Sequence, residues 1–361
     1  MSKVDIEEYL DSYKPMVEAI LQKSLPRKIS KQYVDRISGK PAFGYDTQAL
    51  ENGLSIPVWD FLDRGGKRWR PTMFLLLVDA LGGDVEKVRD FAAVIELVHN
   101  GTIIEDDIED GAQLRRGRKC LHELFGVDTA INCGNAIYFL PLSMFVNNEH
   151  NFSSDTIVAA YNIYAREMIN VHLGQAMDIS WHRGEKDPAL ITESQYMQMC
   201  AYKTGTLARM SAKLAAVFSG ARPDEVEILG KFAESIGVAF QIQDDILDIV
   251  SSGDDRDKFG KPYGNDITEG KITLLVIKTL AAADSTDRTR LVSILQSHTR
   301  NKSEIDEAIA IISKYGAIEQ AQKLASNLVI SSWEDAKRVL PEGISRDVLE
   351  SFAYFLVERN I

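Results

Sequence analysis

Apolar residues recur at three- and four-residue spacing along most of this 361-residue chain, the period of an α-helix with one buried face. No segment alternates polar and apolar residues convincingly over the length of a strand. The pattern therefore predicts an all-α fold, a single-domain helical bundle around a central cavity. The expected helical segments are residues 73–81, 91–104, 157–179, 196–218, 226–250 and 305–329.

Polar stretches rich in Gly and Asp separate these segments and indicate turns between helices rather than linkers between domains. We therefore expect a short, mobile N-terminal arm, residues 1–25, followed by one domain, residues 26–361. The longest polar stretch, residues 251–270, carries too few apolar residues to bury a face, and a loop of that length in a compact domain is usually functional. Its position after an acidic cluster predicts a lid.

Two acidic clusters share one internal spacing, an Asp pair with a third Asp four residues after the first. On a helix the outer carboxylates stand one turn apart on one face, where like charges repel unless a divalent cation lies between them. Carboxylate oxygens in this arrangement suit Mg²⁺ that is held together with substrate phosphate oxygens. The clusters are Asp106-Asp107-Ile108-Glu109-Asp110 and Asp244-Asp245-Ile246-Leu247-Asp248.

Each cluster extends into a polar stripe on its predicted helix. His99 and Thr102 share a face with Asp106 and Asp110, and Gln241 shares a face with the second cluster. Because the rest of each helix is apolar, we expect the two stripes to face each other across a cavity that is wet at its mouth and apolar at its base.

Basic and kinked motifs accompany the clusters in a fixed order: Gly65 to Pro71, Leu114 to Gly117, Lys203 to Gly205 and Phe240 to Gln243. With Leu97 to Gly101 and Asn135 to Leu140, they make the chain similar, over nearly its whole length, to the trans-isoprenyl diphosphate synthases, the polyprenyl synthetase family. The closest resemblance is to geranylgeranyl diphosphate synthases of eukaryotic and archaeal type.

The resemblance implies a Mg²⁺-dependent prenyltransferase, with three ions bound when substrate is present. Isopentenyl diphosphate would condense head-to-tail with the cation that forms when an allylic diphosphate (dimethylallyl, geranyl or farnesyl) ionises. The implied product is geranylgeranyl diphosphate, a C20 chain, and the implied assembly is a homodimer.

The resemblance also assigns roles to single residues. Asp106, Asp110 and Asp244 would bind Mg²⁺ directly, and Asp107, Asp245 and Asp248 would support them. The allylic diphosphate and the developing cation would be contacted by Arg115, Lys203, Thr204, Gln241 and Lys271, with Lys258 and Lys261 added from the lid. Isopentenyl diphosphate would be held by Lys67, Arg70, His99 and Arg116.

Product length is a steric question, because the prenyl chain grows away from the metal ions until a large side chain stops it. Gly101 and Thr102 are small and leave no block just before the first cluster. Tyr138 and Phe139 are then the expected floor of the cavity. If their rings point elsewhere, the product is C25 or longer.

Composition narrows the partners. The formal net charge of −12 argues against nucleic acid, which is bound mainly through basic contacts to phosphate. Three Cys without metal-ligand spacing fit a reducing compartment. The acidic N-terminus is unlike a signal peptide and no apolar run approaches 18 residues, so we expect a cytoplasmic protein without stable membrane insertion.

Other classes of protein stay open from sequence alone. A terpene cyclase or squalene-type synthase shares the Mg²⁺-assisted ionisation but needs no second basic diphosphate site. A farnesyl diphosphate synthase, a non-catalytic partner subunit and a plain structural helical protein are further alternatives. The paired acidic clusters argue against the last two.

Overall fold

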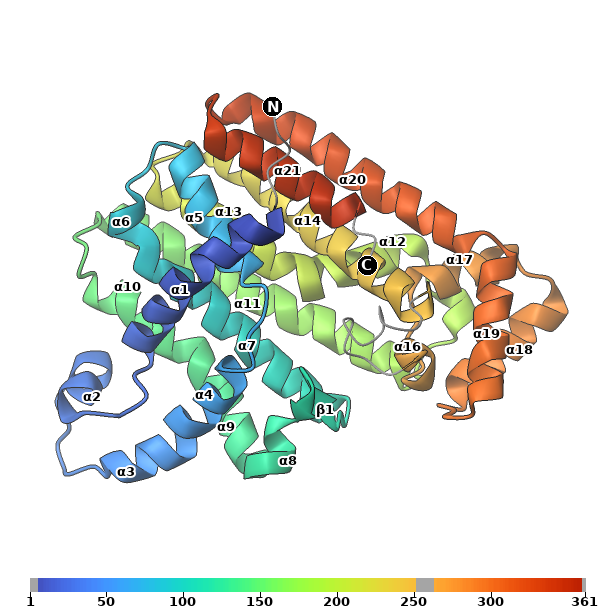
Figure 1. Ribbon diagram of the computed structural model, residues 1–361, viewed down its shortest axis with the longest axis horizontal. Helices are drawn as coiled ribbons and strands as arrows, with labels where there is room; N and C mark the ends of the chain where they lie inside the picture. Colours follow the sequence, from blue (N-terminus) through green and yellow to red (C-terminus); the bar gives the residue numbers. More distant parts are fainter. Residues whose placement is uncertain (1–5, 251–262, 359–361) are drawn as a thin grey trace. The chain divides into compact units, whose positions relative to one another are not determined.

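The computed structural model describes residues 6–250 and 263–358, and nearly all of them lie in helices or in the turns between them, which confirms the all-α prediction (Figure 1). Within these residues the strands are confined to a short antiparallel hairpin, β1 (Leu114–Arg115) and β2 (Arg118–Lys119). This hairpin follows the first acidic cluster directly.

The chain folds as two compact units. Unit 1 comprises Met1–Tyr164, Ser211–Val226 and Glu342–Leu349, and unit 2 comprises Ala165–Met210, Glu227–Pro341 and Glu350–Ile361. This division does not coincide with the boundary that the sequence predicts at residue 25. The two acidic clusters belong to different units.

Unit 1 is built mainly from the first half of the chain. Its elements are α1 (Ile6–Ser24), α2 (Lys31–Ser38), α3 (Thr47–Leu50), η1 (Glu51–Ser55), α4 (Ile56–Leu62), α5 (Trp69–Ala80), α6 (Val85–Val88), η2 (Arg89–Phe91), α7 (Ala92–Glu109), the β-hairpin, α8 (Leu121–Phe125), α9 (Val127–Phe139), η3 (Leu140–Leu142) and α10 (Ser143–Asn147).

Unit 2 is built mainly from the second half. Its elements are η4 (Pro188–Leu190), α12 (Glu193–Cys200), η5 (Ala201–Gly205), α16 (Asn265–Thr268), α17 (Leu274–Ala282), α18 (Ser285–Gln296), α19 (Lys302–Lys314) and α20 (Ala317–Val339). Four helices contribute to both units: α11 (Ser154–His182), α13 (Thr206–Phe218), α14 (Pro223–Val250) and α21 (Ile344–Glu358).

Most of the predicted N-terminal arm is helical in the structure. Residues 6–24 form α1, and its apolar face, including Leu10, Val17 and Leu21, is buried within unit 1. The helix packs on α5 and α7. The acidic residues near the N-terminus make this apolar stripe hard to recognise from the sequence.

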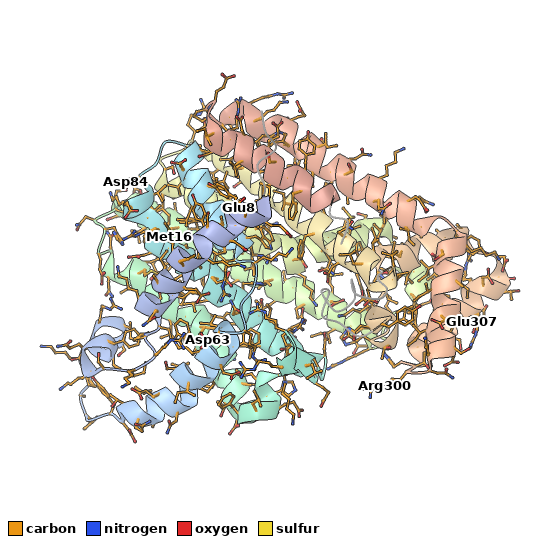
Figure 2. The ribbon with its side chains drawn as sticks, viewed as in Figure 1. Glu8, Met16, Asp63, Asp84, Arg300 and Glu307 are labelled. Carbon is orange, nitrogen blue, oxygen red and sulfur yellow. The ribbon has the colours of Figure 1, made fainter. Side chains whose placement is uncertain are left out.

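The segment predicted as one helix from 305 to 329 is two helices. Asn301 caps α19 through its side chain, and the chain reverses at Gly316, whose φ of 65° lies in the left-handed region. Glycine adopts that conformation without steric cost, so it separates α19 from α20 although the apolar spacing continues across the break. Arg290 of α18 also donates a hydrogen bond to Glu307 of α19 at 2.6 Å. Glu307 is labelled in Figure 2.

The predicted lid, residues 251–270, is described only in its C-terminal part, since residues 251–262 lie outside the described residues. There Asn265–Thr268 form α16, and Ile267 is buried.

The first acidic cluster is carried by the pair α7 and α9, whose backbones approach closely. A methyl group added at Gly101 of α7 would lie 2.7 Å from Cε1 of Tyr138 and 2.9 Å from the carbonyl oxygen of Gly134, both on α9. Gly134 faces α7 in the same way, because a methyl group there would lie 2.9 Å from the side chain of Glu105. Glycine on both helices is what permits this contact.

The segment Val127–Asn147, which runs through α9, η3 and α10, is the single stretch of the described residues that is long and apolar enough to cross a membrane. Pro141 interrupts it. One such segment is weak evidence, because apolar helices of proteins that never enter a membrane meet the same criteria.

Candidate functional site

The carboxylates of the first cluster, at the end of α7, differ in their exposure. Asp106 and Asp110 are half-buried and lie one turn apart, whereas Asp107 is buried. The Asp107 carboxylate accepts a hydrogen bond from Arg115 at 2.6 Å, and Arg115 lies 3.6 Å from Asp106. Burial raises the pKa of Asp107, and Arg115 offsets part of this rise. Asp107 thus holds Arg115, while its neighbours remain accessible to a metal ion.

The β-hairpin sets the positions of the two arginines. Arg115 pairs with Arg118, which leaves Arg116 and Gly117 as the two turn residues. Both have positive φ, 52° and 73°, as a type I′ turn requires. Arg116 adopts a conformation that costs energy for a residue with a side chain, and such strain is commonly found at functional sites.

Arg70, His99 and Arg116, all expected to bind isopentenyl diphosphate, lie in one cationic cluster of unit 1. Nη1 of Arg70 lies 3.4 Å from Nε2 of His99, and no carboxylate among the described residues forms an ion pair with Arg70 or Arg116. Burial, with the charge of nearby arginines, lowers the pKa of Arg116 to about 10, and burial lowers that of Arg70 to about 10. The same causes hold the pKa of His99 well below its ordinary value, so this imidazole is neutral near pH 7.

Aromatic rings support these cations. The Arg70 guanidinium lies 4.3 Å from the centre of the Trp69 ring, and that of Arg116 lies 5.2 Å from the centre of the Phe61 ring. Cation–π contacts offset only part of the cost of burying a charge. A buried and a half-buried arginine without a carboxylate ion-pair partner in the described part of the chain are therefore a place where an anion binds favourably.

Lys67 differs from the other residues predicted to bind isopentenyl diphosphate. Its side chain is exposed and lies 3.5 Å from Glu7 of α1. The residue next to it, Arg68, is buried and donates to Glu18 at 2.8 Å and to Glu96 at 2.6 Å. The sequence prediction included neither Arg68 nor Glu96. Helical spacing could have identified Glu96, since it lies three residues before His99 on an otherwise apolar segment.

In unit 2, the second acidic cluster shows the same division by exposure. Asp244 is half-buried, and Asp245 is buried and accepts hydrogen bonds from Tyr196 at 2.6 Å and from Gln241 at 2.9 Å. Oγ1 of Thr204 donates to Gln241 at 2.9 Å, which joins η5 to α14. Burial and the nearby Asp266 raise the pKa of Asp245. Tyr196 and Asp266 were absent from the sequence prediction.

Asp248 has a structural task. Its two carboxylate oxygens accept hydrogen bonds from the backbone N–H groups of Asn265 and Asp266, at 3.2 and 3.1 Å, at the start of α16. The residue is fully buried. Asp248 thus anchors the start of α16, and its supporting role at a metal site stays a prediction.

Lys203 and Thr204 lie in η5, a π-helical turn, and turns of this kind often occur at functional sites. Nζ of Lys203 donates to Asp178 of α11 at 2.5 Å. A methyl group at Gly174 would lie 2.3 Å from the backbone nitrogen of Lys203, so glycine is required where α11 crosses the π-turn. Lys271, the remaining basic residue expected in unit 2, forms an ion pair with Glu269.

Asp178 was missed because no other carboxylate lies within a turn of it on α11. Its signal was the pair formed with His182 one turn later on α11. The charges of Asp178, Lys203 and Lys271 all act on His182, whose pKa is lowered chiefly by burial. These four residues therefore form a second group of charged side chains, within unit 2.

Gly101 is small, as the product-length prediction requires, and it lies directly against α9. A methyl group added there would meet Tyr138 and the carbonyl oxygen of Gly134. Oγ1 of Thr102 donates to the carbonyl oxygen of His99 on its own helix. Phe139 is 66% exposed and cannot form a buried floor within unit 1.

Tyr138 remains as the candidate floor residue. Its ring is buried against α7, and its hydroxyl donates to Glu105 at 2.8 Å, one residue before the first cluster. Lys258 and Lys261, the two predicted lid contacts, lie outside the described residues.

The donor sets of both clusters fit Mg²⁺, since the accessible Asp106, Asp110 and Asp244 provide the hard oxygen ligands that this ion prefers. Among residues 6–250 and 263–358, no three His, Cys, Asp or Glu side chains form a metal site by themselves. Mg²⁺ is commonly held by one or two carboxylates with water and phosphate oxygens.

Comparison with known proteins identifies relatives over most of the chain. Residues 51–312 match the family model described as Polyprenyl synthetase. The chain is 37% identical over 296 residues to a short chain isoprenyl diphosphate synthase of Methanothermobacter thermautotrophicus, covering 82% of this chain and 87% of that protein. It is 35% identical over 311 residues to a geranylgeranyl pyrophosphate synthase of Geoglobus acetivorans, covering 85% and 91%.

The fold is also similar to solved structures. The crystal structure of geranylgeranyl pyrophosphate synthetase from Pyrococcus horikoshii Ot3 superposes with a TM-score of 0.78 at 29% identity, covering 97% of this chain and all of that one, 100%.

Proposed function

Because the chain belongs to the polyprenyl synthetase family, we propose that this trans-prenyltransferase condenses isopentenyl diphosphate with an allylic diphosphate to give geranylgeranyl diphosphate. One observation carries the substrate assignment, namely the buried Arg70 and the half-buried Arg116 beside the neutral His99. This cationic cluster is separate from the accessible carboxylates of α7 and provides the second diphosphate site that a terpene cyclase does not need.

The cluster suits isopentenyl diphosphate. Arginine donates two parallel hydrogen bonds to phosphate oxygens, and a partly desolvated arginine does so more strongly than an exposed one. His99 is held neutral, so it can donate one N–H without adding a further charge. The turn at Gly65 and Gly66 exposes Lys67 beside them, where its ammonium adds a point charge.

The carboxylates Asp106, Asp110 and Asp244 would hold Mg²⁺, and we propose three ions with substrate bound. When bound, the metal neutralises the allylic diphosphate and makes it a better leaving group. We propose Arg115, which Asp107 holds in unit 1, and Lys203, which Asp178 holds in unit 2, as ligands of diphosphate oxygens. Thr204 and Gln241 line the π-turn, where their dipoles would face the developing positive charge.

The relatives named as geranylgeranyl and short chain synthases support a C20 product. The buried Tyr138 ring supports it from the structure, because a rigid ring between α7 and α9 can limit the length of the chain. C25 or longer remains the alternative product.

A homodimer is also part of the proposal. Val127, Ile131 and Phe139 are exposed apolar residues of α9, and Val146 is another on α10. A second copy of the chain covers such a surface more favourably than water does. A cytoplasmic location without stable membrane insertion stays a prediction.

The test is an incubation of the purified protein with Mg²⁺, labelled isopentenyl diphosphate and each of three primers: dimethylallyl, geranyl and farnesyl diphosphate. A C20 product from farnesyl diphosphate is expected. No elongation with any primer would contradict the proposed condensation, and a main product of C15 or of C25 and above would contradict the chain length.

A further inference from the structure

Arg68 lies between Lys67 and Arg70 in sequence, but its side chain has a different environment. Its guanidinium is 1% exposed and reaches carboxylates on two helices, Glu18 of α1 and Glu96 of α7. It also donates to the carbonyl oxygen of Leu62 at 2.8 Å. With these partners it has little capacity left for a ligand.

We propose that Arg68 is a positioning residue for isopentenyl diphosphate, which joins α1 to α7 and thereby fixes the turn that presents Lys67, Arg70 and Arg116. This inference rests on the proposed function, because it assumes that the cationic cluster binds that substrate.

The backbone of the turn supports this role. Arg68 has a φ of 50°, in the left-handed region that residues with side chains rarely adopt. Such a conformation persists where surrounding contacts over-determine it. The bonds to Glu18, Glu96 and Leu62 supply those contacts.

The same backbone turn also supports Arg116. The Arg116 guanidinium donates to the carbonyl oxygen of Gly65, and a methyl group at Gly66 would lie 3.4 Å from its Nη2 atom. Gly66 has a φ of 144°, which also favours glycine. A shift of the turn would therefore displace Arg116 as well as Lys67 and Arg70.

Charge balance gives Glu96 a specific part in the network. Its Oε1 atom accepts from Arg68 and, at 2.8 Å, from Asn100, the residue after His99. Glu96 is 3% exposed at its side chain, so it neutralises Arg68 inside the unit. Arg70 and Arg116 feel the charge of Glu96 but form no ion pair with it, so their N–H groups are not taken up by this carboxylate.

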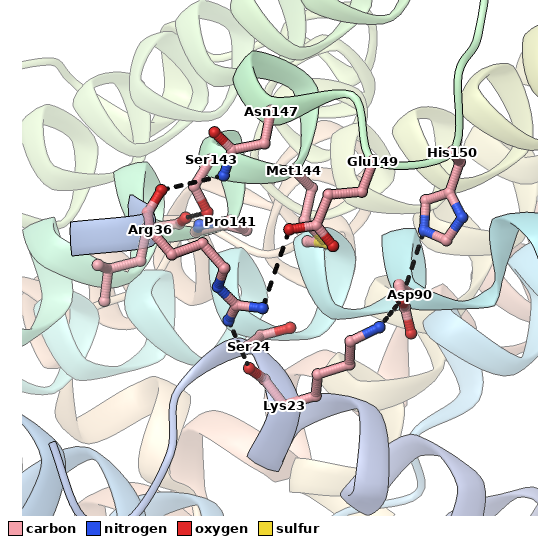
Figure 3. A pocket seen from close by; sticks show the side chains of 11 residues that line it. Lys23, Ser24, Arg36, Asp90, Pro141, Ser143, Met144, Asn147, Glu149 and His150 are labelled. Carbon is pink, nitrogen blue, oxygen red and sulfur yellow. Dashed lines mark hydrogen bonds and ion pairs between the residues drawn. The ribbon is translucent and has the colours of Figure 1, made fainter. Parts of the chain in front are cut away.

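A matched control exists at the other end of α1. Lys23 forms an ion pair with Asp90, which also lies 3.4 Å from Nε2 of His150 (Figure 3). This pair also fastens α1 to the segment that leads into α7, but it lies beside a different pocket, lined by Arg36, Met144 and Glu149 among others. Lys23→Gln loosens the same helix without touching the turn.

The experiment measures binding of isopentenyl diphosphate by calorimetry, without metal or allylic substrate, together with KM for each substrate, kcat and Tm. The variants are Arg68→Met, Arg68→Lys and Glu18→Gln, with Lys23→Gln as the control. Glu18 is partly exposed, so Glu18→Gln keeps the test usable if Arg68→Met fails to fold.

We expect Arg68→Met to weaken isopentenyl diphosphate about tenfold in Kd and KM, with kcat and the allylic KM within about threefold of wild type. Arg68→Lys keeps the charge but cannot bridge two carboxylates, so its loss should be intermediate. Glu18→Gln should lose about threefold, and Lys23→Gln should keep wild-type affinity even if its Tm falls.

Two results would overturn the inference. The first is equal loss of both substrates in the Arg68 variants, which indicates general structural damage. The second is unchanged isopentenyl diphosphate affinity in Arg68→Lys and Glu18→Gln while Lys67→Ala and Arg70→Ala weaken it; the proposed function would then stand without the inference. If Lys67→Ala and Arg70→Ala also leave affinity unchanged, the substrate assignment itself fails.

Discussion

Replacement of Gly101 by Ala tests how closely α7 and α9 must pack beside the first acidic cluster. The added methyl group would meet Cε1 of Tyr138 at 2.7 Å, the carbonyl oxygen of Gly134 at 2.9 Å and Cγ1 of Ile137 at 3.1 Å. The ring is buried and the carbonyl belongs to a helix, so neither contact is the mobile end of a flexible side chain. The helices must move apart.

The magnitude follows from two opposing effects. Overpacking a core usually costs about 1–3 kcal/mol, and the rigid partners favour the upper part of that range. Alanine gains about 1 kcal/mol over glycine within a helix. A net loss of about 1–2 kcal/mol is expected, which for a chain of this length lowers Tm by only about 1–3 °C.

A matched glycine makes the small effect measurable. A methyl group at Gly53, in η1 of the same unit, meets nothing within 4 Å. Gly53→Ala should therefore keep or raise the midpoint of denaturant unfolding, and Gly101→Ala should lower it. If both variants unfold at the same midpoint, the close contact of α7 and α9 is not a constraint on this chain.

Three further predictions concern product length, assembly and pH. Tyr138→Ala should lengthen the product beyond C20 as the growing chain enters the vacated space, whereas Tyr138→Phe should keep C20, and chromatography of the products checks both. Ile131→Glu with Phe139→Glu should convert a dimer to monomer in sedimentation, because each places a charge at an exposed apolar position of α9; a dimer that persists would locate the interface elsewhere. His99 has a lowered pKa in the folded state, so the unfolded chain binds the proton more readily, and stability falls as pH drops below about 6.5 by up to about 1.4 kcal/mol per pH unit. His99→Gln should lose less stability than wild type between pH 7 and about pH 5.5, and equal losses would refute the burial argument.

The helices and the acidic clusters could be predicted because both depend on short-range spacing. An apolar period near 3.6 residues defines α7 and α14, and the Asp spacing defines the faces that Asp106 and Asp244 occupy. The break at Gly316 was missed because the apolar spacing continues through it, and only a positive φ marks the turn. The packing of α1 was missed because charged residues alternate with the apolar ones at its start.

The supporting residues could not be predicted, since their partners are distant in sequence. Arg68 meets Glu18 and Glu96 from 50 and 28 positions away, and Lys203 meets Asp178 from 25. Spacing along one helix does not reveal such pairs. The close packing of Gly101 against α9 could not be predicted either, because the contacting residues lie on another helix.

The most direct test of the central claim is the turnover of Asp244→Ala, measured with saturating Mg²⁺, isopentenyl diphosphate and farnesyl diphosphate. If Asp244 helps to neutralise the leaving diphosphate, its loss should raise the barrier by several kcal/mol, reducing kcat about a hundredfold or more while Tm changes little. Turnover above about a tenth of the wild-type rate would mean that the second acidic cluster does not take part in the ionisation, and the account would be wrong at its centre.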